Sequence, residues 1–189
     1  MLKKAIRDEY LQKRLKLDDE VYNDYSAAIV SNLSLLELPK IEYLLSYYPL
    51  AARKEFDVSL CVATVKDKWP QVRIAWPRIG SDIKSMEAYR VKEDGLYAKN
   101  KFNILEPING ELVEVELIDL VFVPMVAFDT NGYRVGYGKG FYDRYLPRCR
   151  PDVIKIGFSF FDPVYNIKDI ADFDVPLNFC ITPSRIYEF

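Results

Sequence analysis

The sequence predicts a three-layer α/β/α fold with a mainly parallel sheet, built as one domain over residues 1–189. Segments with apolar residues at helical spacing alternate with short strand-like runs, which is typical of parallel-sheet proteins. One run, LIDLVFVP at 117–124, is almost continuously apolar, as expected for a parallel strand covered on both faces. The length of 189 residues suits one domain, and no linker or internal repeat divides the chain.

Two helices are predicted at the start of the chain. In residues 2–17, apolar side chains recur every three or four positions among lysines and arginines. Asp18 or Asp19 can cap a second helix, which runs to about residue 36 and is stopped by Pro39. A pair of consecutive helices is therefore expected before the first strand.

The remaining elements follow in order. Residues 58–69 fit a helix better than a strand, and a short helix is expected over 141–145, limited by Pro147. Besides the run at 117–124, strands are expected at 41–46, 71–76, 86–91, 153–158 and 178–182. Pro77 is expected to end the strand at 71–76. This alternation is the basis of the fold prediction.

The composition excludes several classes of function. The chain has no histidine, which rules out Ser-His-Asp and Cys-His catalytic systems and metal sites built on histidine. Acid–base work must then fall to Asp, Glu, Lys, Tyr or the substrate. A net charge of −2 argues against binding nucleic acid through phosphate contacts. No run of about 18 apolar residues exists and no apolar stretch follows the charged start, so we expect neither a membrane span nor a signal peptide.

Half of the eight glycines lie in one short segment after the predicted strand at 117–124. They fall within nine residues: Gly132, Gly136, Gly138 and Gly140. Glycines let backbone amides approach an anion, and ligands bind beyond the carboxyl ends of strands in open α/β sheets. Arg134 and Lys139 add positive charge, and a helix start follows, so the segment predicts a phosphate site. It matches neither Walker A nor GxGxxG, and a glycine-rich surface turn is the alternative.

Motifs along the whole chain resemble one enzyme family. The string PMVAFD at 124–129 is followed by GYRVGYGKGFYDRYL at 132–146. Further matches, in order, are KKAIR at 3–7, LS at 45–46, EFD at 55–57, WPR at 76–78, NILEP at 103–107, DVPL at 174–177 and TP at 182–183. Together they resemble the 5-formyltetrahydrofolate cyclo-ligase (5,10-methenyltetrahydrofolate synthetase) family over essentially the whole chain, at the family's usual length.

The resemblance implies an ATP-dependent ligase whose architecture is related to sugar-phosphate isomerases and CoA transferases. The family converts 5-formyltetrahydrofolate to 5,10-methenyltetrahydrofolate with MgATP and releases ADP and phosphate. ATP phosphorylates the formyl oxygen, the folate nitrogen at position 10 attacks, and phosphate departs as the ring closes. This chemistry depends on positioning and on cations at the γ-phosphate, so it needs no histidine.

The resemblance also assigns roles to residues of this chain. Lys139 and Arg134 would be catalytic, and Asp143 and Asp174 would hold Mg²⁺. ATP would be bound by Lys3, Lys4, Ala5, Ile6, Arg7, Arg134, Val135, Gly136, Tyr137, Gly138, Lys139, Gly140, Phe141 and Tyr142. The folate would contact Arg7, Leu45, Glu55, Tyr137 and Phe141. The gap between Ser46 and Glu55 is longer than the family's usual one, so Glu42 is the alternative to Glu55 as the pterin contact.

Other interpretations of these residues stay open. Lys3, Lys4 and Arg7 could form a solvated helix face, Tyr137 and Phe141 could be core, and Asp143 could be a helix-start acid. The chain could also be a different enzyme on a related fold, such as a sugar-phosphate isomerase or CoA transferase, or a non-catalytic binder of nucleotide or folate. Three cysteines without a CxxC pair favour free thiols in the cytoplasm. Both a monomer and a homodimer are compatible with the sequence.

Overall fold

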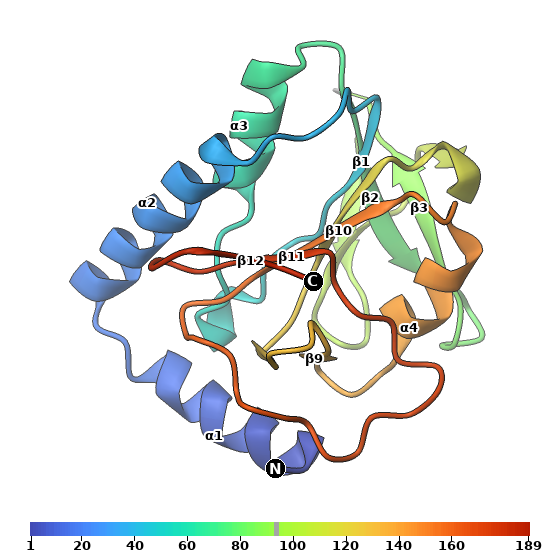
Figure 1. Cartoon of the computed structure of the whole chain (residues 1–189). Helices are drawn as coiled ribbons and strands as arrows, with labels where there is room; N and C mark the ends of the chain where they lie inside the picture. The colour runs from blue at the N-terminus through green and yellow to red at the C-terminus, as the bar shows by residue number, and fades with distance from the viewer. Residues whose placement is uncertain (93–94) are drawn as a thin grey trace.

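The structure, a computed structural model, describes residues 1–92 and 95–189. The strands of its central sheet are Tyr43–Leu45 (β1), Arg73–Ile79 (β2), Met86–Arg90 (β3), Glu111–Val113 (β6), Leu120–Val123 (β7), Ile154–Phe158 (β10), Phe179–Ile181 (β11) and Ile186–Glu188 (β12). They lie in the order β12-β11-β10-β7-β1-β2-β3-β6 (Figure 1). Two small hairpins stand apart from this sheet: Tyr97–Lys99 (β4) with Leu105–Pro107 (β5), and Ala127–Phe128 (β8) with Arg134–Val135 (β9).

The five middle strands of the sheet are parallel. Strands β11, β10, β7, β1 and β2 all run in one direction, and β12, β3 and β6 extend the edges in antiparallel pairing. The chain passes from β1 to β2 on one side and later returns to β7, β10 and β11 on the other. The direction of winding therefore reverses between β1 and β7, where open α/β sheets leave a crevice at the carboxyl ends of the strands.

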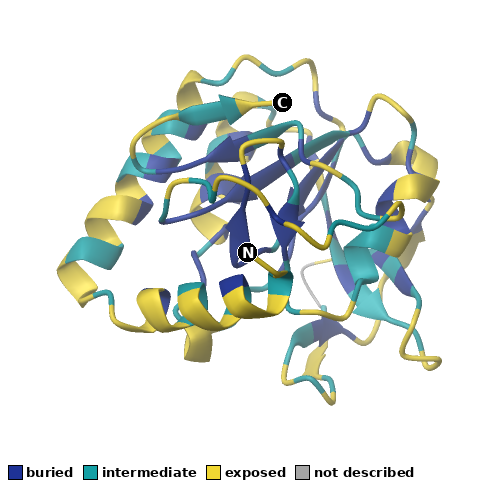
Figure 2. Ribbon diagram, turned by 60° about the horizontal axis from the view of Figure 1, so that its bottom comes forward, coloured by how far each residue is buried: buried dark blue, intermediate teal, exposed yellow. Residues whose placement is uncertain are grey.

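Helices cover both faces of the sheet, which gives the predicted three layers. On one face lie Asp19–Leu35 (α2) and Ser59–Lys68 (α3), whose Ile29 and Cys61 pack in one cluster with Phe122 of β7. On the other face lies the short helix Phe141–Tyr145 (α4), continued by a 3₁₀ turn, and its buried Tyr145 packs with Val121. Figure 2 shows the central strands buried and the outward sides of the helices exposed.

The first helix, Lys3–Leu15 (α1), packs against the β8–β9 hairpin rather than flat on the sheet (Figure 1). Its Ile6 is fully buried in a small cluster with Ala127 and Val135 of that hairpin and with Ile167. This cluster fixes the N-terminal turn of α1 beside the segment that carries the glycines.

Most predicted elements are confirmed. The helices at 2–17, 18–36, 58–69 and 141–145 are present, and the Asp18 carboxylate caps α2 by accepting a hydrogen bond from Val21 N at 2.8 Å. The run at 117–124 does hold a strand with all four residues buried, but only Leu120–Val123. Its start is a 3₁₀ turn, and the Asp119 carboxylate accepts hydrogen bonds from the backbone of Glu42 and Tyr43.

One predicted strand boundary is wrong. Pro77 does not end β2, which continues to Ile79 and pairs Pro77 with Ala88 of β3. The strand β1 pairs with β2 only as far as Ala75, so the missing N–H of proline falls where no ladder partner remains. Two residues later, Ile79 N instead donates to the Glu106 carboxylate at 2.9 Å.

Of the antiparallel strands, only β3 was predicted, as the strand at 86–91. Strands β4, β5, β6, β8, β9 and β12 are two or three residues long, too short for a hydrophobic period to stand out. Among the described residues, no helix has the length and apolar character required to cross a membrane.

Candidate active site

A cavity of about 570 Å³ opens at the place where the winding of the sheet reverses. Leu50, in the loop after β1, and Pro124, directly after β7, both line it. The cavity therefore lies beyond the carboxyl ends of these two adjacent parallel strands, the usual ligand position in open α/β sheets. Its volume is within the range of small-molecule sites.

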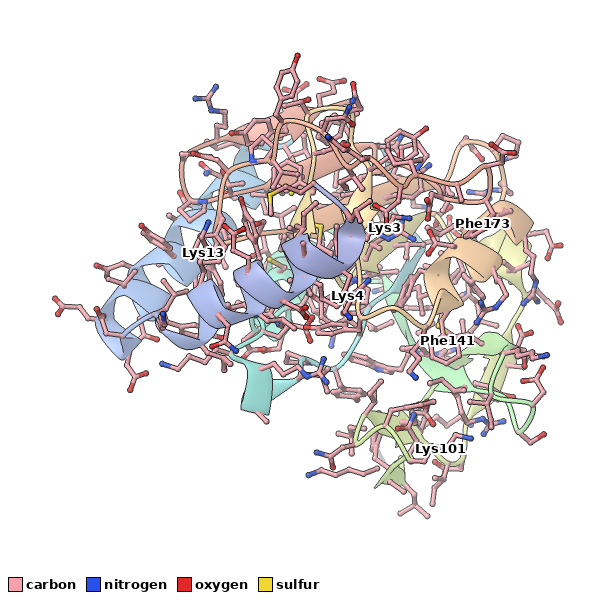
Figure 3. All side chains as sticks on the ribbon, turned by 90° about the horizontal axis from the view of Figure 1, so that it is seen from below. Lys3, Lys4, Lys13, Lys101, Phe141 and Phe173 are labelled. Atoms are coloured by element: carbon pink, nitrogen blue, oxygen red, sulfur yellow. The ribbon has the colours of Figure 1, made fainter. Side chains whose placement is uncertain are left out.

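Segments that are far apart in the sequence meet at this cavity. They are the first turns of α1, the loop after β1, the turn between β4 and β5, the glycine segment with α4, and the segment before β11. Figure 3 shows Lys3, Phe173 and Phe141 around the N-terminal end of α1, Lys101 farther away at the bottom of the view, and Lys13 toward the other end of that helix. The cavity is lined by Lys3, Arg7, Leu50, Arg53, Lys101, Phe102, Asn103, Ile104, Pro124, Arg134, Gly136, Tyr137, Gly138, Lys139, Gly140, Phe141, Tyr142, Asp143, Phe173 and Asp174.

The cavity wall is strongly cationic although the whole chain is slightly acidic. Six lysine and arginine side chains line it, against two aspartates. Positive charge concentrated in a concave site of low dielectric raises the local concentration of anions. The wall is therefore suited to a ligand that carries several negative charges.

Within the glycine segment, residues 136–140 form a loop that has two glycines in the left-handed region. Gly138 has a φ of +85° and Gly140 a φ of +67°, conformations that side-chain-bearing residues rarely adopt. Gly136 has no such φ, and a Cβ built there meets no atom within 4 Å. The first two glycines named are thus needed for backbone shape, whereas Gly136 leaves free space on the cavity side.

Helix α1 is tied directly to this loop. Arg7 Nε donates to the carbonyl oxygen of Gly136 at 2.7 Å. A Cβ on Gly138 would lie 3.5 Å from the Arg7 guanidinium carbon, so the guanidinium rests against the loop. Lys139 is exposed, with Nζ 5.1 Å from the centre of the Phe102 ring on the facing turn. Two cations therefore flank the loop.

The two predicted metal-binding aspartates are each paired with a cation. Asp143 Oδ1 accepts from the buried Arg134 at 2.7 Å, and Arg134 also donates to the carbonyl of Val175. Burial lowers the pKa of the Arg134 guanidinium, and Asp143 opposes this shift. Asp174 forms an ion pair with Lys3 and accepts from the backbone of Ala171. These pairs fasten the segment before β11 to β9 and α1.

A buried polar chain lies behind the cavity wall. The hydroxyl of Tyr137 donates to Glu55 Oε1 at 2.6 Å, and Arg14 donates to the same hydroxyl at 2.6 Å. Leu50 N donates to the other Glu55 oxygen at 2.8 Å. Burial raises the pKa of the Glu55 carboxyl, while Arg14 and the hydrogen bond from Tyr137 act in the opposite direction.

Aromatic rings form the apolar part of the wall. Phe102 and Phe141 meet edge to face with their centres 6.0 Å apart, and Tyr137 and Tyr142 lie along the glycine loop. Flat rings beside free space are suited to stacking on a planar heterocycle. The wall thus combines an anion-binding loop with a surface for a flat ring system.

A family profile described as the 5-formyltetrahydrofolate cyclo-ligase family matches residues 2–178. The chain belongs to this family. A cyclo-ligase from Mus musculus is 38% identical over 93 residues, which span 45% of this chain and 46% of that protein. A cyclo-ligase from Mycoplasma pneumoniae is 28% identical over 162 residues, which span 85% of this chain and 86% of that protein.

Solved structures of the cyclo-ligase family share the fold. The NMR structure of Aquifex aeolicus 5,10-methenyltetrahydrofolate synthetase matches 100% of this chain and 93% of its own with a TM-score of 0.80 and 31% identity. A 5,10-methenyltetrahydrofolate synthetase from Mycoplasma pneumoniae matches 97% of this chain and 99% of its own with a TM-score of 0.74 and 25% identity. The family and the mainly parallel α/β fold predicted from the sequence are confirmed.

Most residues that the cyclo-ligase resemblance singled out line the cavity, and the rest lie around it. Ile6, Val135 and Leu45 are buried in the core, and Lys4 and Ala5 are exposed on α1 outside the cavity lining. Glu55 lies behind Tyr137 and Leu50 rather than on the surface of the cavity. Its alternative, Glu42, precedes β1 and so lies at the opposite end of that strand, where it pairs with Lys40.

Several lining or supporting residues were not predicted, among them the four described next. Phe102 and Lys101 reach the cavity from the β4–β5 turn, and Arg53 comes from the 3₁₀ turn after β1. Arg14 lies on the same helix as the predicted Lys3 and Arg7 but is buried. The NILEP motif directly after Phe102 was the signal in the sequence that could have indicated the turn. No feature of the sequence distinguishes the buried Arg14 from the exposed cations of the same helix.

Proposed function

We propose that this chain carries out the reaction of its family in the cavity: the ATP-dependent conversion of 5-formyltetrahydrofolate to 5,10-methenyltetrahydrofolate, with release of ADP and phosphate. One observation carries the proposal. The loop 136–140, with its two left-handed glycines, its own Lys139 and the adjacent Arg7, opens onto a cavity that also offers aromatic rings. A triphosphate and a pterin need these two kinds of surface side by side.

The glycine loop and its cations bind the triphosphate of ATP. Backbone amides of Gly138 to Gly140 are available close to a ligand because the glycines present no side chain. Arg7 is held against the loop by Gly136, and Lys3 lies one helical turn away on the same face of α1. The five-residue helix α4 is too short to add much through its dipole, so charge and amides carry the binding.

The reaction proceeds by two substitutions that these residues support. The formyl oxygen attacks the γ-phosphorus of ATP, whose bond to the bridging oxygen breaks, and ADP leaves. Nitrogen 10 of the folate then attacks the formyl carbon and loses its proton, and phosphate departs with the electrons of the carbon–oxygen bond. Lys139 stabilises negative charge on the transferring phosphoryl oxygens, which is the larger part of catalysis in phosphoryl transfer.

Arg134 acts through Asp143 in this scheme. Its guanidinium is only 5% exposed and is committed to the Asp143 carboxylate and to the carbonyl of Val175. A cation engaged in this way keeps the aspartate at a fixed place on the wall. Arg134 therefore contributes by positioning Asp143 and by its charge.

The carboxylates on the wall fit a magnesium ion. In residues 1–92 and 95–189, Asp143 Oδ2 and Asp174 Oδ1 make no hydrogen bond, while the second oxygen of each residue pairs with a cation. Mg²⁺ is usually held by one or two carboxylates together with phosphate oxygens. Asp143 and Asp174 would hold it, and the bound ion would neutralise charge on the triphosphate.

The folate lies against the aromatic side of the cavity. Tyr137 and Phe141 offer ring faces for the pterin, Phe102 adds a third ring from the opposite turn, and Arg7 reaches both ligands. Leu45 and Glu55 support this side from behind the wall rather than by direct contact. We place the reaction in the cytoplasm, which agrees with three buried cysteines that are all free.

The proposed function is tested by the absorbance of the conjugated methenyl product. Purified protein is mixed with 5-formyltetrahydrofolate and ATP, with and without Mg²⁺. We expect a rise in absorbance that needs both ATP and Mg²⁺ and is matched by equal amounts of ADP and phosphate. Binding of both ligands without a rise would contradict the proposal and leave the cavity as a binding site.

A further inference from the structure

Arg14 is a buried cation that forms no ion pair with any residue that the structure describes. Its side chain is 4% exposed, and its three donor nitrogens each have a neutral partner in the described part of the chain. Nε donates to the Arg53 carbonyl at 2.8 Å, one terminal nitrogen donates to the Met125 carbonyl at 3.3 Å, and the other donates to the Tyr137 hydroxyl at 2.6 Å. Burying a guanidinium among neutral groups is costly, so its place calls for an explanation.

The direction of the hydrogen bonds is fixed by chemistry. An arginine can only donate, an ionised carboxylate can only accept, and a hydroxyl has a single hydrogen to give. Tyr137 must therefore accept from Arg14 and donate to Glu55, at 2.6 Å in both cases. Because the Tyr137 hydroxyl already accepts one hydrogen bond and donates its only hydrogen, this residue can offer only its ring to a ligand in the cavity.

We propose that Arg14 is a positioning residue for folate binding, which sets the ring of Tyr137 by fixing its hydroxyl between itself and Glu55. The inference rests on the proposed function, because it takes Tyr137 as part of the folate surface. It assigns no contact between Arg14 and either substrate. Arg14 instead connects α1, the turn after β1 and the loop after β7 at the back of one tyrosine.

The charges around Glu55 favour this arrangement. The titratable and charged groups that interact with it are Arg14 from α1, Arg53 from the 3₁₀ turn, Tyr22 from α2, Tyr137 from the glycine loop, and the hydroxyls of Tyr47 and Tyr142. Burial raises the pKa of Glu55, and Arg14 is the main opposing influence. Arg53 also lies over the Tyr137 ring, 5.0 Å from its centre, but it is exposed. Arg14 is therefore the buried positive charge that favours the ionised form of Glu55, and Glu55 is the acceptor of the hydrogen bond from the Tyr137 hydroxyl.

The test is a double-mutant cycle read by Michaelis constants. Arg14→Gln, Tyr137→Phe and the double variant are assayed for the Michaelis constants of both substrates, the formyl folate and ATP. We expect each single change to raise the folate constant about tenfold, as losing a hydrogen bond to a charged group does, with the ATP constant changed less than about twofold. The double variant should be no worse than the worse single variant, because both changes break one connection.

Two results would overturn the proposal. Additive effects, with the folate Michaelis constant of the double variant raised about a hundredfold, would mean that Arg14 does not act through the Tyr137 hydroxyl. An equal rise in both Michaelis constants would mean that Arg14 only stabilises the fold. If Arg14→Gln does not fold, Arg14→Lys keeps the charge and the stem but loses the fork, and the same cycle applies.

Lys13→Gln is the matched control. Lys13 is the neighbouring residue on α1 (Figure 3), but its side chain is half-exposed and pairs with the half-exposed Glu9. The Lys13→Gln substitution should leave the Michaelis constants of both substrates unchanged. A wild-type protein that makes no methenyl product contradicts the proposed function, whereas normal wild-type turnover with an unchanged folate Michaelis constant in the Arg14 variants contradicts this inference alone.

Discussion

The side chain of Arg7 is bonded to the backbone of Gly136: its Nε donates to that carbonyl at 2.7 Å. The two residues are 129 positions apart in the chain. This bond holds the first helix against the glycine loop and places a cation where the loop turns. A helix face that could have been merely solvated is thereby part of the cavity wall.

The backbone geometry of the glycine loop predicts different outcomes for substitutions at Gly138 and Gly136. Gly138→Ala forces a Cβ onto a residue with a φ of +85°, a backbone conformation that side-chain-bearing residues rarely adopt, although the Cβ would meet the Arg7 guanidinium only at ordinary contact distance. We expect the free energy of unfolding to fall by about 1–2 kcal/mol and the Michaelis constant for ATP to rise. Gly136 has no such φ and has free space around a Cβ, so Gly136→Ala should change the free energy of unfolding by less than about 0.5 kcal/mol. Urea unfolding of both variants measures the difference, and equal losses would contradict the backbone argument.

Lys139→Ala is expected to remove turnover without harming the fold. The side chain is exposed, and among residues 1–92 and 95–189 its amino group interacts only with the Phe102 ring, so the free energy of unfolding should change by less than about 0.5 kcal/mol. Loss of the charge at the transferring phosphoryl group should lower kcat at least about a hundredfold. Lys66→Ala on α3, also exposed, is the control and should retain full activity. Normal turnover in Lys139→Ala would contradict the phosphate-loop assignment.

Glu55→Gln is expected to weaken folate binding more than ATP binding and to change how stability depends on pH. Because burial raises the pKa of Glu55 above its ordinary 4.5, the folded protein holds this proton more tightly than the unfolded chain. Its contribution to stability therefore falls as pH rises through the range above 4.5. A glutamine does not titrate, so Glu55→Gln does not lose stability in this way. Its free energy of unfolding relative to wild type should therefore rise as the pH is raised above 4.5. Glu42→Gln, whose pKa is lowered by Lys40, should show no such rise.

Asp143→Asn separates the ion-pair role of this residue from its metal role. The change leaves the buried Arg134 without its carboxylate, which should cost about 2–3 kcal/mol of unfolding free energy. The concentration of Mg²⁺ for half-maximal turnover should also rise at least about tenfold, because one of two carboxylates is lost. Asp152→Asn, a surface aspartate paired with Arg150, should change neither quantity. An unchanged magnesium requirement would argue against Asp143 as a ligand, whatever the stability.

Sequence patterns were sufficient to predict the helices and strands in which apolar spacing extends over many residues or a capping residue marks the start. The helices α1, α2 and α3 and the parallel strands were all predicted, because apolar spacing and residues such as Asp18 act locally. The glycine loop was also visible, since glycine and charge in a short segment need no partner to be recognised. The family followed from motifs spread along the chain, and the family profile confirms it.

The tertiary structure decided which of the predicted site residues share one cavity and what each of them faces. Phe102 and Lys101 reach the cavity from a hairpin whose strands are three residues long, and Pro77 continues a strand because its neighbour has already ended. Arg14 and Lys13 look alike in the sequence, yet one is buried behind Tyr137 and the other is half-exposed. Composition and spacing are properties of the chain alone, whereas burial, counter-charge and hydrogen-bond direction depend on which distant segments the fold brings together.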